Sequence, residues 1–478
     1  MATTAGAKKG LWSTIRRIAA SDRISGLIML GFALTGLVLA NLPATAHAFE
    51  TVAETHLFIP YTNLDLPIGH WAQDGLLTIF FLTVGLELKQ ELTTGSLANP
   101  KAAAVPMLCA VGGMIAPPIL FLAVTALFSQ IGPGEPGTLI LTTTGSSIPF
   151  SEMSHGWAVP TATDIAFSLA VLALFAKALP GSIRAFLMTL ATVDDLLAII
   201  LIAVFFSSIN AWYWFIGIAV CAVIWAYLVR LKKVPWIAVG IVGVLAWIMM
   251  FEAGVHPTLA GVLVGLLTPS REMHGELSPR AERYANKLQP FSALLALPIF
   301  ALFATGVHFE SVSPLLLASP LVIALIVALV VGKPLGIITT AWLATHVGGL
   351  KMAKGLRVRD MIPAAVACGI GFTVSFLIAS LAYKNAELSA EARFGVLVAS
   401  LIAAAISGVL LSRQSKRFEK AAAAQAAAAE ALADAEAGES IDGNGTGQPS
   451  RTTKPTTPTE HPGTLADGTA SVEIDFRH

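Results

Sequence analysis

The sequence predicts an all-α, polytopic membrane protein with about twelve membrane-spanning helices, and three observations lead to this prediction. Hydrophobic residues make up 55% of the 478-residue chain, whereas charged residues make up only 13%, against about a quarter in a typical soluble domain. The apolar residues form continuous runs, many near the ~20 residues that a membrane-crossing helix needs, and they lack the alternation of a membrane β-barrel. The basic residues, finally, gather at alternate ends of these runs.

Twelve apolar runs qualify as spans, and the run at 256–268 is the shortest. In order they cover residues 24–42, 71–88, 102–128, 157–176, 183–206, 212–229, 234–251, 256–268, 291–307, 314–346, 361–383 and 392–411. With the N-terminus placed inside the cell, 24 of the 30 Lys and Arg residues fall in inside segments, and only Lys384 and Arg393 fall in outside loops. This asymmetry follows the positive-inside rule, so we expect both termini in the cytoplasm.

The chain divides into three parts by composition. Residues 1–20 form a basic cytoplasmic segment, 21–412 the transmembrane domain, and 413–478 a cytoplasmic, low-complexity and largely disordered tail. An Ala- and Glu-rich stretch at the start of the tail extends the last helix. Among the outside loops, 43–70 carries two short β-like pieces that predict a hairpin, and 129–156 is long and rich in Gly, Pro and Ser.

Charge and cysteine content exclude several other classes. Thirty basic and 30 acidic residues give a net charge of zero, which offers no reason to expect a nucleic-acid partner. The three cysteines, Cys109, Cys221 and Cys368, lie in apolar runs without ligand-like spacing. We therefore expect neither disulfides nor a zinc site.

Four charged residues lie at or near the expected centre of the membrane. Asp194 and Asp195 lie midway along 183–206, Asp164 lies in the fourth span and Lys333 midway along the tenth. Each such charge costs about 2.5–3.5 kcal/mol on insertion scales, so such residues are functional candidates by default. The alternative is a buried ion pair that only sets helix packing, but one lysine cannot neutralise three aspartates.

Asp74 lies near the outer end of the second span, and its position allows two interpretations. It is either an interfacial residue that reaches the lipid headgroups or a vestibule residue that leads to a binding site. The sequence leaves both interpretations open.

The fourth and eleventh spans each contain an interruption in the middle of the membrane. The helix-breaking and polar residues are Pro160, Thr161 and Thr163 in the fourth span, and Gly369, Gly371, Thr373 and Ser375 in the eleventh. Unwound backbone is tolerated at this depth only where protein or water covers it. Spans three to five and ten to twelve run in opposite directions, so the interruptions occupy corresponding places in an inverted-topology repeat, a transporter pattern. Two unrelated kinks are the alternative.

The residues predicted at mid-membrane suit a small, hard cation. The carboxylates of Asp164, Asp194 and Asp195, hydroxyls such as that of Thr163, and carbonyls freed by the broken helices form an oxygen-rich acidic set. Na⁺ or Li⁺ fits such a set, and the same carboxylates also bind protons. We therefore expect Na⁺ and H⁺ to compete for one site, and we expect adjacent aspartates to titrate as a coupled set.

Six motifs resemble the NhaA-type Na⁺/H⁺ antiporters. They are VGLELK at 84–89, ATDIAF at 162–167, VDDL at 193–196, GVH at 254–256, GKPLG at 332–336 and CGIGFT at 368–373. The resemblance runs in order over about 21–412. It implies two discontinuous, crossing helices, made by spans four and eleven, and a multi-pass protein of the bacterial plasma (inner) membrane that exchanges cytoplasmic Na⁺ or Li⁺ for external protons electrogenically.

The resemblance also implies roles for the membrane charges. Asp195 is then the main cation- and proton-binding carboxylate, with Asp194 as its partner. Asp164 would compensate the charged ends of the crossed helices, and Lys333 would form a switchable ion pair with Asp194. The family further suggests a homodimer, with a hairpin of the first outside loop in the contact, surrounded by membrane lipids and without an organic cofactor.

The chain departs from the family pattern before the ninth span. Members often carry Leu-Glu-His-x-Leu-His-Pro-Trp there, whereas residues 284–291 read YANKLQPF and lack the acid and both histidines. That cluster belongs to the family's cytoplasmic pH sensor, so we expect a shifted or flattened pH profile. The remaining candidates for a pH response are Glu87, Glu91, His256 and Glu282. For His256, which stands alone, a purely structural role is the alternative to pH sensing. The 129–156 loop and the tail after residue 412 are further departures.

Three other functions deserve comparison. An intramembrane aspartyl protease typically uses Gly-x-Gly-Asp, yet the sequence contains no Gly-Asp dipeptide and Lys333 has no place in that chemistry. A passive channel has no need for mid-membrane charges at broken helices. A Na⁺-coupled symporter of an organic solute on a similar fold is the strongest alternative, and it would need its solute before Na⁺ flux appears.

Overall fold

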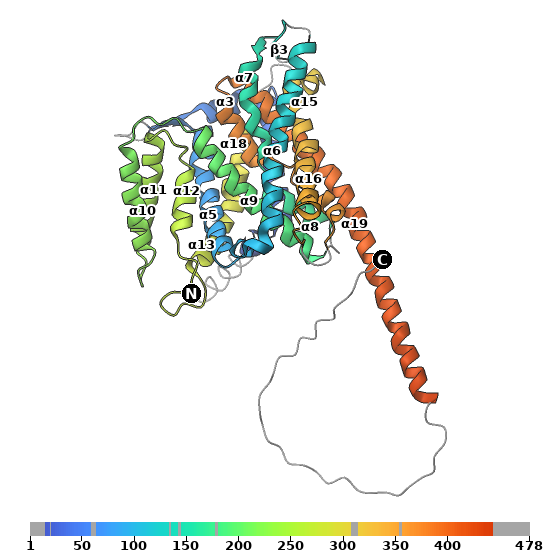
Figure 1. Cartoon of the computed structure of the whole chain (residues 1–478). Helices are drawn as coiled ribbons and strands as arrows, with labels where there is room; N and C mark the ends of the chain where they lie inside the picture. The colour runs from blue at the N-terminus through green and yellow to red at the C-terminus, as the bar shows by residue number, and fades with distance from the viewer. Residues whose placement is uncertain are drawn as a thin grey trace. The chain divides into compact units, whose positions relative to one another are not determined.

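The computed structural model of the chain describes residues 15–19, 21–58, 64–132, 135–141, 145–176, 180–306, 314–352 and 356–442. Helices dominate these residues (Figure 1). In chain order the elements, with η marking short 3₁₀ or π segments, are α2 (Asp22–Asn41), α3 (Ala46–Glu54), β1 (His56–Phe58), β2 (Asp65–Pro67), α4 (Ile68–His70), η1 (Trp71–Leu76), α5 (Leu77–Thr93), η2 (Ser96–Ala98), α6 (Pro100–Ile131), β3 (Thr138–Ile140), β4 (Ser147–Pro149), α7 (Phe150–Ser154), η3 (His155–Thr161), α8 (Ile165–Phe175), α9 (Gly181–Phe205), α10 (Trp214–Leu228), α11 (Trp236–Glu252), α12 (Leu259–Leu267), α13 (Arg280–Phe291), η4 (Ser292–Ala296), α14 (Leu297–Ala304), η5 (Pro314–Ala318), α15 (Pro320–Val327), η6 (Ala328–Gly332), α16 (Lys333–His346), η7 (Val358–Met361), α17 (Ile362–Ala367), α18 (Phe372–Ala382) and α19 (Ala386–Asp442).

Six helical stretches in the described part of the chain are long and apolar enough to cross a membrane. They cover Arg23–Asn41, Ala103–Ile131, Gly181–Phe205, Arg280–Ala304, Pro320–His346 and Ala386–Ala431. Two bent helix pairs raise this number to eight if each pair is one span, and α10 and α11 are shorter apolar helices. The protein is thus a polytopic helical membrane protein, whereas the twelve-span topology stays a prediction.

The two interruptions predicted from the sequence are real breaks. Phe150–Thr161 and Ile165–Phe175 meet at 50°, and Val358–Ala367 and Phe372–Ala382 meet at 58°. Proline removes a backbone donor in the first pair, and glycines interrupt the second. Both breaks fall inside apolar sequence, as the pattern of residues indicated.

Several predicted span boundaries differ from the observed helices. The helix expected at 291–307 begins at Arg280, because the amphipathic helix α13 continues without a break into the apolar segment. The last helix begins at Ala386 rather than at residue 392. Arg393, which the prediction placed at the very start of this span, lies two turns into the helix and donates hydrogen bonds to the carbonyls of Ser389 and Ala304.

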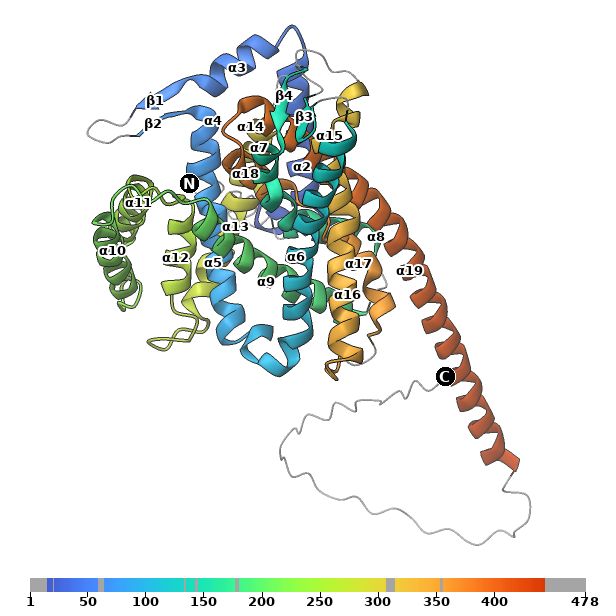
Figure 2. The ribbon, with the colours of Figure 1, turned by 45° about the horizontal axis from the view of Figure 1, so that its top comes forward.

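The 43–70 and 129–156 loops each contain a small antiparallel hairpin. In the first, β1 pairs with β2 with Leu57 opposite Leu66, which confirms the hairpin predicted in the 43–70 loop. Figure 2 shows it reaching out from the helical body next to α3 and α4. In the second, β3 pairs with β4 with Leu139 opposite Ile148. The sequence analysis did not anticipate this second hairpin in the 129–156 loop.

Helix packing separates two groups that matter for the site. The first group is α5 with α12 and α13, where α5 packs on both partners. The second group is α6 with α9 and α16, where α6 packs on both partners. Helices α10 and α11 pack on each other and stand side by side at one edge of the body (Figures 1 and 2).

The chain forms two compact units, Met1–Ser415 and Lys416–His478. The first unit contains all the elements from α2 to α18 and the start of α19. The second unit begins with the remainder of α19, an Ala-rich helix described to Asp442. The disorder expected at 443–470 falls outside the described residues.

Candidate ion-binding site

The two broken helices meet at their interruptions. The Asp164 backbone N–H donates to the Ile370 carbonyl at 2.7 Å, and the Thr163 hydroxyl donates to the Cys368 carbonyl at 2.9 Å. These contacts join segments about 200 positions apart in sequence, since Thr163 and Cys368 are separated by 205 residues. Backbone groups freed by one break are therefore satisfied by the other, as burial requires.

Close backbone approach explains why glycine stands at one side of this junction. A Cβ added to Gly369 would lie 2.5 Å from the Leu329 carbonyl oxygen, a distance that Cβ atoms do not adopt. On the other side, Pro160 ends the helical hydrogen bonding, and the Thr161 hydroxyl turns back to the Ala158 carbonyl at 2.6 Å. The sequence thus encodes both breaks locally, while the packing brings them together.

The Asp164 carboxylate accepts hydrogen bonds at the N-termini of two helices. Its Oδ1 accepts from the Phe167 backbone N–H at 2.9 Å, which makes Asp164 the N-cap of α8. Its Oδ2 accepts from the Thr373 backbone N–H at 3.2 Å and from the Thr373 hydroxyl at 2.8 Å, in the first turn of α18. A helix N-terminus carries partial positive charge, so one buried carboxylate compensates two helix ends.

Lys333 lies at the opposite, negative end of the first broken helix. Its ammonium donates to Asp194 Oδ2 at 2.7 Å and to the carbonyl of Thr161, the last residue of η3. A cation at a helix C-terminus is electrostatically favourable. Lys333 is 0% exposed and Asp194 is 1% exposed, so water screens this ion pair very little. Asp194 Oδ1 has no hydrogen-bond partner among the described residues.

Asp195 is the least engaged of the three aspartates. It follows Asp194 on α9 and is 7% exposed, and no hydrogen bond to its carboxylate is found in the described part of the chain. Four charged groups among the described residues lie close enough to act on the Asp195 carboxylate. The acids, in decreasing order of effect, are Asp194, Asp164 and Glu87, and Lys333 acts in the opposite direction. Three buried carboxylates thus face one buried ammonium, and the surplus of negative charge favours an additional cation or protons.

A second buried acid–base pair lies apart from the crossing. Asp74 lies in the π turn η1, is 9% exposed, and has its Oδ1 3.5 Å from His256 Nε2. The other ring nitrogen of His256 lies 2.6 Å from the Thr258 hydroxyl, and the Trp247 indole donates to the Asp74 carbonyl at 3.0 Å. Of the two interpretations of Asp74, the structure favours a residue inside the protein over one among headgroups.

The three glutamates predicted for a pH response occupy different surroundings. Glu87 and Glu282 are exposed, on α5 and α13 respectively. Glu91 is half-buried and accepts from both the backbone N–H and the hydroxyl of Ser96 at 2.8 Å. The structure places Glu87 within electrostatic reach of Asp195.

Sequence reasoning did not identify two participants in the junction. The Ser168 hydroxyl donates to the Ala367 carbonyl at 2.8 Å, and it stands one helical turn after Asp164, which is the signal that could have identified it. The carbonyl of Thr161 as an acceptor for Lys333 had no sequence signal, because a backbone oxygen carries no residue identity.

The donors available to a cation are oxygens. No group of three His, Cys, Asp or Glu side chains in the described residues is arranged to hold a metal ion. The carboxylates of Asp194 and Asp195, with hydroxyls and carbonyls of the crossing, form the oxygen set that suits a hard monovalent ion or protons. Fold and site together define a class: multi-pass helical membrane proteins with a charged site at two broken helices.

Comparison with known proteins narrows this class. The family model described as Na⁺/H⁺ antiporter 1 matches residues 16–145 and 138–411, and the chain belongs to this family. It is 96% identical over 478 residues, 100% of both chains, to "Na(+)/H(+) antiporter NhaA" of Bifidobacterium longum (strain NCC 2705). It is 87% identical over 477 residues, again 100% of both, to the protein of the same name in Bifidobacterium breve (strain NCIMB 8807 / UCC2003). The family resemblance inferred from the motifs is thus confirmed.

Proposed function

We propose that this chain exchanges Na⁺ or Li⁺ for protons across the membrane and thereby extrudes cytoplasmic sodium. The observation that carries the proposal is the geometry at Asp194 and Asp195. One aspartate is paired with the buried Lys333 at 2.7 Å, while its neighbour has no such partner in the described residues and keeps 7% of its surface accessible. The two Bifidobacterium relatives described above bear the name Na(+)/H(+) antiporter NhaA, which agrees with this chemistry.

The proposed mechanism is competition for shared carboxylates. A buried carboxylate without a counter-charge is unfavourable, so Asp195 binds either a proton or a cation. Na⁺ entering beside Asp195 draws on Asp194 as a second ligand and weakens its bond to Lys333. Protons entering from the other side displace Na⁺ by neutralising Asp195, and Asp194, which stays ionised, pairs again with Lys333.

Alternating access then moves the loaded site between the two faces of the membrane. In this proposal the twelve spans form an inverted-topology repeat, with spans four and eleven crossing at the site and with both termini in the cytoplasm. The membrane is the bacterial plasma (inner) membrane. The protein works as a secondary transporter, without an organic cofactor, and as a homodimer that uses hairpin β1–β2 in its contact. Asp74, Glu87, Glu91, His256 and Glu282 modulate cation entry and the response to pH.

The direct test uses purified protein in liposomes with an imposed pH gradient and a fluorescent pH probe. Addition of NaCl or LiCl should dissipate the gradient, and choline chloride should not. Asp195→Asn should abolish the response because a neutral amide cannot exchange a cation for a proton, whereas Glu54→Gln, a change of an exposed outer acid, should leave it intact. Wild-type exchange by Asp195→Asn would contradict the site assignment. A response that appears only after an organic solute is added would contradict the antiport itself.

A further inference from the structure

Thr189, Ser96 and Glu91 form a continuous chain of hydrogen bonds outside the crossing. The Thr189 hydroxyl donates to the Ser96 hydroxyl at 2.9 Å, and the Ser96 hydroxyl donates to Glu91 Oε2 at 2.8 Å. The backbone N–H of Ser96 donates to the same carboxylate oxygen at 2.8 Å. An ionised carboxylate only accepts, so Glu91 directs the Ser96 hydrogen toward itself and leaves the Ser96 oxygen free to accept from Thr189.

This chain joins the two helix groups described above. Ser96 begins η2, the short connection between α5 and α6 that packs on both helices, whereas Glu91 lies on α5, which packs on α12 and α13. Thr189 lies on α9, which packs on α6, and it precedes Asp195 by six residues, or about 9 Å along the helix. The link therefore connects the α5 group to the helix that carries the proposed ion-binding carboxylates.

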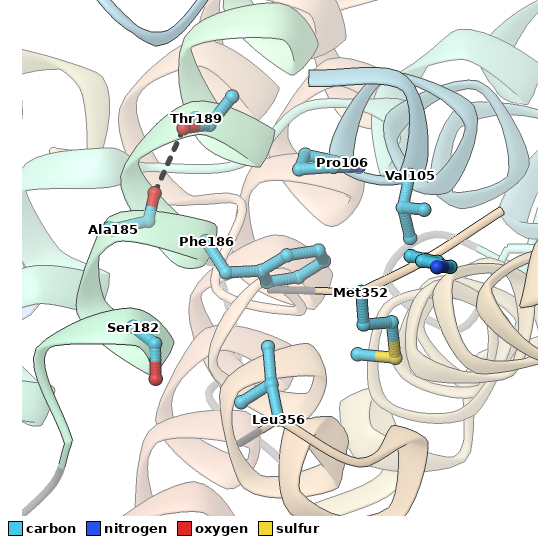
Figure 3. A pocket seen from close by; sticks show the side chains of 9 residues that line it. Val105, Pro106, Ser182, Ala185, Phe186, Thr189, Met352 and Leu356 are labelled. Atoms are coloured by element: carbon cyan, nitrogen blue, oxygen red, sulfur yellow. Dashed lines mark hydrogen bonds between the residues drawn. The ribbon is translucent and has the colours of Figure 1, made fainter. Parts of the chain in front are cut away.

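The same part of α9 also borders a cavity. A cavity of about 150 Å³ is lined by Phe186 and Thr189 of α9, by Val105 and Pro106 of α6, and by Met352 and Leu356 beyond α16 (Figure 3). Figure 3 also shows the Thr189 hydroxyl 2.9 Å from the Ala185 carbonyl of its own helix, so its single hydrogen is shared between this carbonyl and the Ser96 oxygen. The side chains that line this cavity lack packing partners across it, which leaves the N-terminal half of α9 some room to shift.

We propose that Thr189 is a positioning residue and that the Thr189–Ser96–Glu91 chain is a latch on the N-terminal half of α9. While closed, the latch holds α9 and its carboxylates against the α5 group. During the exchange cycle it opens, and the adjacent cavity gives α9 space to move. This inference rests on the proposed exchange function, and it adds a specific contact that the cycle must break.

Cross-linking tests whether the latch opens. In Ser96→Cys/Thr189→Cys, the sulfurs replace oxygens that lie 2.9 Å apart, within reach of a disulfide after small side-chain adjustments. Oxidation in liposomes should reduce Na⁺-driven exchange at least about tenfold, and dithiothreitol should restore it. Wild-type exchange with the disulfide shown by mass spectrometry to be complete would overturn the proposal. A pair that cannot be oxidised would overturn it too, because it would show that the side chains are not adjacent.

The chain offers a matched control for this cross-link. The hydroxyls of Thr93 and Ser270 lie 2.6 Å apart and join α5 to the segment between α12 and α13, within one helix group. Oxidised Thr93→Cys/Ser270→Cys should therefore exchange at nearly the wild-type rate. The native cysteines are buried and free. Variants with only one of the two introduced cysteines, treated with the same oxidant, show how much of any loss of exchange comes from the native cysteines. Absence of exchange in the untreated wild-type protein would instead contradict the proposed function.

Point substitutions test the hydrogen bond itself. Thr189→Val keeps the shape of the side chain but removes the hydroxyl, and should change the apparent Na⁺ affinity by about two- to tenfold, the range of one ordinary hydrogen bond. Thr189→Ser should restore the wild-type value. Thr192→Val is the control, because among the described residues its hydroxyl bonds only to the Met188 carbonyl of its own helix, at 2.7 Å. Equal behaviour of Thr189→Val and Thr189→Ser would contradict a role for this hydroxyl.

Discussion

Replacing Lys333 by methionine should destabilise the protein by leaving a buried carboxylate without its counter-charge. Methionine keeps the unbranched shape of lysine and removes only the ammonium, so the packing changes little. The Lys333 side chain is fully buried and its Nζ lies 2.7 Å from Asp194 Oδ2. The other oxygen of Asp194 already has no hydrogen-bond partner in the described residues, and the Thr161 carbonyl would lose its ammonium donor as well.

The expected magnitude follows from these contacts. Removing one partner of a buried ion pair costs about 3–5 kcal/mol, because the remaining charge is neither solvated nor paired. In a domain of this size, that corresponds to a fall in melting temperature on the order of 3–10 °C. The second change, Asp194→Asn in the Lys333→Met background, removes the orphaned charge. It should recover most of the loss.

The assay is a double-mutant cycle read by thermal unfolding of the detergent-solubilised protein, followed by tryptophan fluorescence. The ion-pair interpretation predicts a coupling energy of about 2–3 kcal/mol between the two positions. Lys384→Met, a change of an exposed lysine, is the control and should leave the melting temperature within about 1 °C. Additive effects of the Lys333 and Asp194 substitutions would refute this reasoning, since they would show that the pair does not interact.

Three further predictions concern other parts of the structure. Thr373→Val removes the hydroxyl that donates to Asp164 at 2.8 Å; it should lower stability by about 1.5–3 kcal/mol, and Thr373→Ser should restore the melting temperature. Gly369→Ala places a methyl group 2.5 Å from the Leu329 carbonyl oxygen of η6 and so pushes the break between α17 and α18 away from that segment; it should reduce both the melting temperature and the exchange rate, and a variant with wild-type values for both would contradict this close approach. The hydrogen bond from Arg280 lowers the pKa of Glu276 below its ordinary value of 4.5. The ionised carboxylate therefore stabilises the fold at pH values above 4.5, and this contribution is lost as the pH falls through the lowered pKa. Chemical denaturation should therefore find Glu276→Gln less stable than wild type at neutral pH and equal to it in strong acid; a difference that is independent of pH would exclude the ionised pair.

Local sequence signals predicted the features that depend on residue type alone. Apolar runs and few charges predicted a polytopic helical membrane protein, because hydrocarbon excludes charge over a fixed thickness. Pro160 and Gly369 predicted the two breaks, because proline lacks a donor and glycine weakens a helix wherever they stand. The charges of Asp194 and Lys333 within apolar runs were likewise visible from residue type alone.

Helix boundaries at the membrane surface were predicted less well. Helix α13, which begins at Arg280 and leads into the predicted ninth span, is amphipathic and rich in polar residues. A hydropathy window cannot distinguish such a polar helix from a loop. The second outer hairpin was missed as well. Its short strands hold together by pairing with each other, and Gly, Pro and Ser in the surrounding loop obscure the alternating pattern.

The contacts that make a site depend on segments far apart in the chain, and only the tertiary structure decided them. Charge alone does not determine which aspartate receives the Lys333 ammonium, since Asp194 and Asp195 are adjacent and the lysine lies 139 residues from its partner. The double capping role of Asp164 likewise exists only because the two breaks are packed against each other. The sequence by itself determined which groups the membrane must accommodate, because burial of a charge is unfavourable at any position in the hydrocarbon. Three-dimensional packing decided which partners those groups find. Hydrogen bonds and contact ion pairs need atoms about 3 Å apart, and the order of residues along the chain does not show which atoms come that close.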